Sequence, residues 1–326
     1  MRRHLHNATP SPLEGEGGEG GVGRVVLLAL VLVLLFASAP AAAELRVLAS
    51  TTDLKSLVEA VGSSDVAVDS VVPPGADAEA FEPKPSDLVR LRAASLVVRV
   101  GLGYDGWLDR LIRQTGDARF FRGGAADVDA SVGIPLLEVV GRGLEPQQQG
   151  HAHGAANPHY WLDPANADTI TAMIAEGIGR VAPALAERVA ANRLRFLTAL
   201  AGRTRDWQAR LAPYAGAAVI AYHGSWPYFA RRFRLNIVGV IEPKPGIAPS
   251  PAHLARLVAS ARETKPRAVL HEPFEPVDTA RLVATRTGAP LIVLAPSVGS
   301  LAGTGDYMAL IEHNVAALAR ALAAAE

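Results

Sequence analysis

Residues 165–211, ANADTITAMIAEGIGRVAPALAERVAANRLRFLTALAGRTRDWQARL, separate two regions of a different kind. Their apolar residues recur at helical spacing with arginines between them, which predicts amphipathic helix. Pro183 interrupts the pattern near its middle. In front of the stretch, Asp163-Pro164 is a typical helix start, with a capping Asp and a Pro in the first turn. We therefore expect two successive helices, of which the second, reaching Leu211, is long.

On both sides of this helical stretch, short apolar runs alternate with helical patterns, which indicates parallel sheets with crossover helices. Strands are expected at 45–50, 66–72 and 95–100 before it, and at 217–222, 237–241, 267–270 and 291–294 after it. In such sheets ligands bind at the carboxyl ends of the strands. The sequence therefore predicts an α/β protein with two lobes, 44–164 and 213–326, joined by a rigid helical link, 165–212, with a ligand site in the cleft between them.

The N-terminal residues 1–43 have the pattern of a cleaved signal peptide. An apolar run, 25–43, follows Arg24 and ends in three alanines, although residues 1–23 do not resemble a normal start of such a peptide. The alternative is an uncleaved membrane anchor, because the run has about the minimum length for a span. The chain has no cysteine, which excludes disulfides, thiolate metal ligands and a lipid anchor. We expect a freely diffusing periplasmic protein.

The composition argues against two classes of partner. Lys+Arg and Asp+Glu balance at 32 each, so there is no electrostatic reason to expect nucleic acid or an acidic membrane surface.

Four metal-competent residues lie just after expected strands or between prolines: Glu79, His159, His223 and Glu272. Taken singly, each has an ordinary explanation, as a surface acid or as a hydrogen-bonded core histidine. Asp77 and Glu82 compete with Glu79, and His271 competes with Glu272, although strand alternation turns one of that pair away. His151 and His153 form either a weak secondary metal-catching loop or an ordinary polar one.

Two carboxylates and two imidazoles make a nitrogen/oxygen site without sulfur. Such a site suits borderline divalent ions, with zinc first and manganese or Fe(II) as alternatives. Calcium and magnesium prefer shells made only of oxygen. The sequence contains no Walker loop, nucleophile elbow or HExxH motif.

At these residues the chain resembles the zinc/manganese solute-binding proteins of ABC importers, the TroA-like or cluster A-I group. The resemblance spans about 45–324 and is carried by 74–77 (PGAD), 81–83 (FEP), 157–164 (NPHYWLDP), Tyr222-His223 and Glu272-Pro273. It implies two (β/α) lobes linked by one long helix, with a single metal between them.

This sequence departs from the family pattern at two positions. The first motif usually carries a His where this chain has Glu79, and the last ligand is usually an Asp where this chain has Ala295. His159 and His223 carry over directly, and Glu272 is our inference for the missing fourth ligand.

The resemblance implies binding and not catalysis. A monomer would close slightly around the metal and deliver it to the permease of an ABC importer in the inner membrane. Imidazoles must be neutral to bind, so affinity is expected to fall towards about pH 6. The rivals are a periplasmic metalloenzyme, such as a hydrolase that uses the same His/Glu site, and an adhesin on the same fold.

Overall fold

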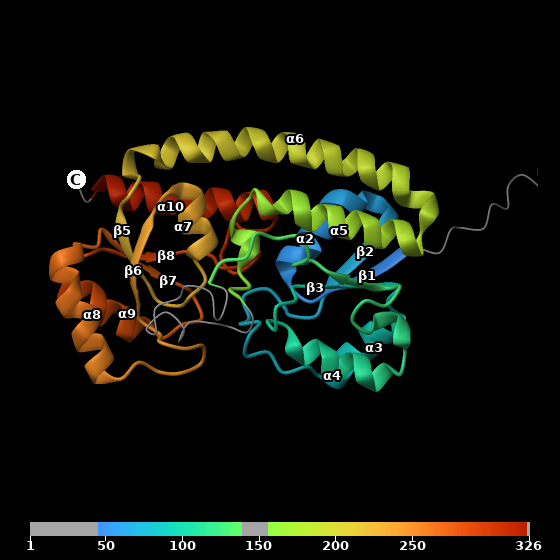
Figure 1. Ribbon diagram of the computed structural model, residues 1–326, viewed down its shortest axis with the longest axis horizontal. Coiled ribbons are helices and arrows are strands. Elements are labelled where there is room, and N and C mark those ends of the chain that lie inside the picture. Colours follow the sequence, from blue (N-terminus) through green and yellow to red (C-terminus); the bar gives the residue numbers. More distant parts are fainter. Residues whose placement is uncertain (1–44, 139–155, 325–326) are drawn as a thin grey trace, which may run out of the picture. The chain divides into compact units, whose positions relative to one another are not determined.

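The computed structural model describes residues 45–138 and 156–324, in which two separate four-stranded sheets carry the fold (Figure 1). Every strand pair in both sheets is parallel, which confirms the predicted α/β class. The first sheet has the order β2 (Val66–Ser70), β1 (Leu45–Ala49), β3 (Leu96–Arg99) and β4 (Asp127–Asp129). The second sheet repeats this order with β6 (Asn236–Val240), β5 (Ala218–Ala221), β7 (Ala268–His271) and β8 (Leu291–Val293).

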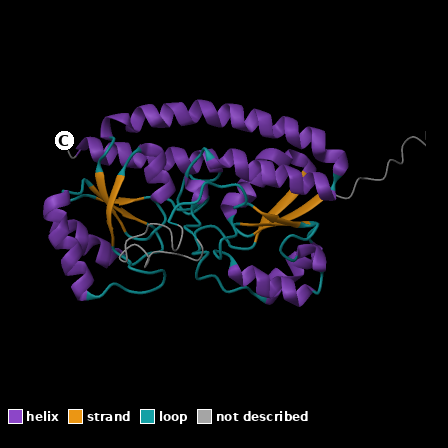
Figure 2. Ribbon diagram, in the orientation of Figure 1, coloured by secondary structure: helices purple, strands orange, loops and turns teal. Residues whose placement is uncertain are grey.

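Helices connect the strands and cover the sheets (Figure 2). Those of the first half are α2 (Thr52–Gly62), α3 (Pro85–Ala93) and α4 (Gly106–Thr115), followed by α5 (Asn166–Val181) and α6 (Ala186–Leu211). Those of the second half are α7 (Pro227–Phe233), α8 (Pro251–Thr264), α9 (Val277–Thr287) and α10 (Tyr307–Ala324).

Helix α6 is the long second helix expected from the sequence. Its 26 residues correspond to about 39 Å, and in Figure 1 it runs along both groups of strands. It contacts α2 and α5 of the first half and α7 and α10 of the second. Two buried side chains hold it in place, because Asn192 Nδ2 donates to the carbonyl of Val61 at 2.8 Å and Trp207 Nε1 donates to Glu312 at 2.8 Å.

The expected capping bond of Asp163 is present, but this carboxylate has a second role that the sequence did not predict. Helix α5 begins at Asn166, and its N-cap residue, Ala165, makes no side-chain capping bond. Asp163 Oδ1 nevertheless accepts from the N–H of Ala165 at 3.0 Å, in the turn that leads into α5, and the fully buried carboxylate also contacts two arginines of α7. Arg232 Nε lies at 2.5 Å and Arg231 at 3.2 Å from its carboxylate. A buried carboxylate needs a cationic partner, so Asp163 both caps the turn and forms an ion pair.

Buried hydrogen bonds join the two halves directly, near the loops that follow the strands. Thr52 Oγ1 donates to the carbonyl of Val298 at 2.8 Å, and the N–H of Val298 donates to Asp53 Oδ1 at 2.9 Å. Trp161 Nε1 donates to the carbonyl of Pro296 at 3.0 Å. The halves are therefore cross-linked at these loops as well as by α6.

Among the residues that the structure describes, no helix is both long enough and apolar enough to cross a membrane. The predicted signal peptide, residues 1–43, and the histidines His151 and His153 lie outside the described residues.

Candidate metal centre

A cavity of about 390 Å³ lies between the carboxyl ends of the two sheets. Its walls come from the loops that follow β1, β2, β3, β5, β6, β7 and β8, which is where open parallel sheets present ligand-binding residues. No Lys or Arg is among the described residues that line it. Its titratable lining consists of one tyrosine, Tyr104, the imidazoles of His159 and His223, and five carboxyl groups, those of Asp53, Asp77, Glu79, Glu242 and Glu275.

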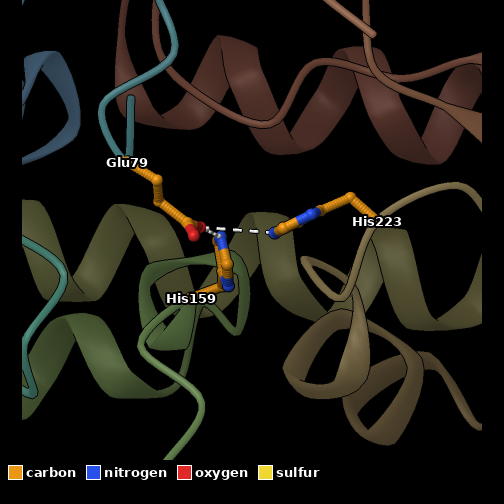
Figure 3. Close-up of side chains that lie close together, drawn as sticks. All are labelled: Glu79, His159 and His223. Atoms are coloured by element: carbon orange, nitrogen blue, oxygen red, sulfur yellow. Dashed lines mark hydrogen bonds and ion pairs between the residues drawn. The ribbon is translucent and has the colours of Figure 1, made fainter. Parts of the chain in front are cut away.

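Glu79, His159 and His223 point toward one another in this cavity (Figure 3). Glu79 Oε1 lies 3.2 Å from His159 Nε2 and 3.3 Å from His223 Nε2. The two imidazole rings are 5.5 Å apart between centroids. Both histidines are buried, whereas the Glu79 side chain is 18% exposed. One ligand atom from each residue lies within 4.8 Å of the others, so a single divalent ion can contact all three.

The loop that carries Glu79 is fixed by its own sequence. Pro73 and Pro74 restrict the backbone, and Gly75 turns it with a φ of 77°, which favours glycine. The N–H of Glu79 donates to Asp77 Oδ1 at 2.8 Å, and Trp107 Nε1 donates to the carbonyl of Ala78 at 3.0 Å. Asp77, a rival of Glu79 in the sequence, thus shapes the loop that presents Glu79.

Asn157 sets the orientation of His159. Asn157 Nδ2 faces two acceptors, Gly224 O at 2.7 Å and Glu138 Oε2 at 2.9 Å, so the other atom of this amide is its oxygen. That oxygen accepts from the backbone N–H of His159 at 3.0 Å and faces His159 Nδ1 at 3.2 Å. The hydrogen-bond network therefore assigns the ring proton to Nδ1 and leaves the lone pair of Nε2 directed at Glu79.

Glu242 orients His223 in the same way. His223 follows β5, and its Nδ1 contacts Glu242 Oε2, while the other carboxylate oxygen of Glu242 accepts from the N–H of Gly246 at 2.7 Å. Burial by itself lowers the pKa of His223, but the carboxylates of Glu242 and Glu79 raise the pKa well above its ordinary value. A carboxylate on the second nitrogen of a histidine is the usual support of a metal-binding imidazole.

Three electron-pair donors therefore converge on one point. With Nδ1 protonated on both rings, the Nε2 lone pairs of His159 and His223 face the same oxygen of Glu79. Lone pairs at this separation repel one another unless a proton or a metal cation lies between them. The arrangement can hold a borderline divalent ion through two nitrogens and one carboxylate.

Glu272 lies outside this group of three. It is fully buried, its Oε1 accepts from Trp226 Nε1 at 2.7 Å, and its Oε2 has no hydrogen-bond partner. It does not line the cavity, although its charge acts on His223. Burial raises the pKa of Glu272 to about 7. Its role as the fourth ligand stays a prediction.

The structure separates the remaining sequence candidates. Glu82 is exposed and lies outside the cavity lining, and His271 is buried with Nε2 3.0 Å from the carbonyl of Glu275. Ala295, where the family usually has Asp, is buried and is not part of the cavity lining, and the side-chain amide of Asn314 forms hydrogen bonds of 2.8 Å with its backbone N–H and carbonyl.

The sequence interpretation did not include three acids that line the cavity: Asp53, Glu242 and Glu275. Asp53 and Glu242 each come soon after a strand, so the rule that selected His223 applies to them too. Glu275 stands four residues beyond β7, in a turn whose direction no local signal gives.

Comparisons with known proteins agree with the fold and the chemistry. A family model described as zinc-uptake complex component A, periplasmic, matches residues 47–321. The chain is 27% identical over 263 residues to the high-affinity zinc uptake system protein ZnuA of Yersinia pestis, covering 76% of this chain and 81% of that protein. It is 24% identical over 278 residues to the manganese-binding lipoprotein MntA of Halalkalibacterium halodurans, covering 83% and 86%.

A solved structure gives the same result in three dimensions. The solute-binding protein FpvC of Pseudomonas aeruginosa, in complex with Mn²⁺, superposes with a TM-score of 0.72 at 25% identity. The match covers 87% of this chain and 100% of that one. With a family model that spans nearly all the described residues, and with two parallel sheets facing a cavity of carboxylates and imidazoles, the chain belongs to the periplasmic zinc-uptake component A family.

Proposed function

We propose that this protein captures one divalent transition-metal ion in the cavity and delivers it to the permease of an ABC importer. The observation that carries the proposal is the convergence of Glu79 with the Nε2 atoms of His159 and His223, in a cavity whose described lining contains no Lys or Arg. The two-nitrogen, carboxylate donor set suits zinc, with manganese and Fe(II) as competitors. The relatives named for zinc uptake and for manganese binding support the first two of these ions.

The ion is cargo and not a resident catalyst. We propose that the chain is exported by its signal peptide, residues 1–43, works in the periplasm as a monomer without a lipid anchor, and catalyses no reaction. The buried bonds between Val298 and the Thr52–Asp53 segment support a small closure upon binding, because they already join the two halves.

Metal titration tests the proposal. The full exported protein, stripped with a chelator, is expected to bind one Zn²⁺ tightly, and competition with Mn²⁺ and Fe(II) ranks the ions. His159→Ala and His223→Ala should each weaken binding by at least about 100-fold, because even a partner behind a ligand contributes 10–100-fold. Unchanged affinity in both variants would overturn the assignment, and turnover of an ester or phosphate substrate would favour the metalloenzyme.

The fourth ligand is tested separately with Glu272→Gln. If Glu272 binds the ion, this variant weakens binding strongly, because the second carboxylate of the set is lost. Glu82→Gln is the matched control, since Glu82 is exposed and outside the cavity lining. Equal affinities of these two variants would remove Glu272 from the ligand set.

A further inference from the structure

His223 belongs to two groups of metal-competent atoms in the described residues. One group is Glu79, His159 and His223, and the other is His223, Glu242 and Glu275. In each group, the ligand atoms lie within 4.8 Å of one another. The first group uses the Nε2 edge of the His223 ring, at 3.3 Å from Glu79, whereas Glu242 contacts the Nδ1 edge. Glu79 and Glu242 therefore lie at opposite edges of one imidazole.

The second group has a carboxylate that is presented to the cavity by a fixed backbone. The N–H of Glu275 donates to the carbonyl of Glu272 at 3.1 Å, and its own carbonyl lies 3.0 Å from His271 Nε2. The Glu275 carboxylate lines the cavity and has no hydrogen-bond or ion-pair partner among residues 45–138 and 156–324. Its neighbours Phe274 and Pro276 are exposed, so this turn forms part of the rim.

The charge of the cavity favours a second cation position. Five carboxyl groups line it, and no lining residue in the described part of the chain is Lys or Arg. Burial raises the pKa of Asp53 and of Glu275 to about 7, so all five are ionised only above this pH, where one divalent ion at Glu79 offsets only part of their negative charge. Glu272 is fully buried and interacts electrostatically with both His223 and Glu275, although burial raises its pKa to about 7 and it is therefore only partly ionised at neutral pH.

We propose that His223 Nδ1, Glu242 and Glu275 form a second, weaker divalent-metal site at the rim, which the ion occupies on its way to the Glu79–His159–His223 centre. This inference rests on the proposed metal-capture function. A neutral imidazole offers one lone pair, so His223 serves one centre at a time. The two sites are therefore occupied alternatively, and the protein holds one tightly bound ion. The rim site binds the ion transiently as it passes from solvent to the inner centre.

The donor sets of the two sites differ, which makes them distinguishable. The inner site has two imidazoles and one carboxylate, whereas the rim site has one imidazole and two carboxylates. Oxygen-rich sites favour six-coordination, and nitrogen-rich sites are more often tetrahedral. Co²⁺ reports this difference, because tetrahedral Co²⁺ absorbs strongly in the visible region and octahedral Co²⁺ absorbs weakly.

The experiment is Co²⁺ titration of the full exported chain as wild type, His159→Ala, His159→Ala/Glu275→Gln and His159→Ala/Glu82→Gln. Wild type should bind one Co²⁺ with strong bands. His159→Ala should keep a weakly absorbing site, bound at least about 100-fold more weakly than in wild type. Adding Glu275→Gln should weaken this remaining site by a further factor of about 10 or more, and adding Glu82→Gln should leave it unchanged. Circular dichroism confirms that each variant is folded.

The possible failures are separable. If wild type binds no Co²⁺, the proposed function itself is overturned. If wild type binds Co²⁺ but His159→Ala does not, or if Glu275→Gln and Glu82→Gln have the same effect on the remaining site, the rim site is overturned and the proposed function stands.

Discussion

Replacing Glu242 with Gln removes one negative charge behind His223 and leaves the size of the side chain nearly unchanged. Both carboxylate oxygens of Glu242 are acceptors, one facing His223 Nδ1 and the other bound by the N–H of Gly246 at 2.7 Å. Gln has only one acceptor in its amide, so it satisfies only one of these donors. If its NH₂ group faces His223, the ring proton moves to Nε2 and blocks the lone pair that faces Glu79.

The size of the effect depends on pH. At about pH 8.5, loss of this support should weaken metal binding by about 10–100-fold, or about 1.4–2.7 kcal/mol. The pKa of His223 is raised well above its ordinary value by Glu242 and Glu79 against the effect of burial, so at neutral pH the ion must displace a proton. Below that pKa, wild-type affinity falls about tenfold per pH unit.

Glu242→Gln lowers the pKa of His223 and so reduces this proton competition. The loss of affinity in the variant should therefore shrink between about pH 8.5 and about pH 6, and the number of protons released near pH 7 should fall. Isothermal titration calorimetry in two buffers of different ionisation enthalpy measures both quantities. An unchanged affinity at the higher pH, or an unchanged proton release, would refute the role of Glu242 as the support of His223.

Three further predictions concern stability. Gly177→Ala places a Cβ 2.2 Å from Val128 Cγ2 and should destabilise the fold by about 1–3 kcal/mol. In Gly179→Ala the new Cβ lies 3.8 Å from its nearest neighbour, so this variant should be more stable by up to about 1 kcal/mol. Urea unfolding measures both changes. In the structure, Arg99 Nε lies 2.6 Å from Oδ1 of the buried Asp127. Arg99→Met leaves this carboxylate without its cation and should lower the free energy of unfolding by about 3–5 kcal/mol. Burial raises the pKa of Asp53 from 3.8 to about 7, so the folded protein keeps a proton that the unfolded chain releases, and stability falls as pH rises through this range by about 1.4 kcal/mol per unit. Asp53→Asn keeps the acceptor for the N–H of Val298 and should flatten that slope in thermal unfolding; an unchanged slope would mean that Asp53 is not the group responsible.

Local sequence signals predicted most of the architecture, but they missed β4, whose three residues, Asp127–Asp129, form no apolar run. Alternating apolar runs predicted parallel strands, and the arginine-rich helical stretch ending at Leu211 predicted the link between two α/β halves. The same signals led to Glu79, His159 and His223, because the carboxyl ends of parallel strands meet at one edge and because prolines fix the loops around them. These three side chains do converge, while their role as ligands stays a prediction.

Packing between distant segments determined the rest. Asp163 makes the capping bond expected from the sequence, but only the fold brings two arginines of α7 to the same buried carboxylate. Glu272 and Glu275 are both acids just beyond β7. Trp226 binds Glu272 in the interior, and the turn that follows presents Glu275 to the cavity. A sequence places the backbone of such a residue at a strand end, but the direction of its side chain depends on partners that are brought near only when the chain folds.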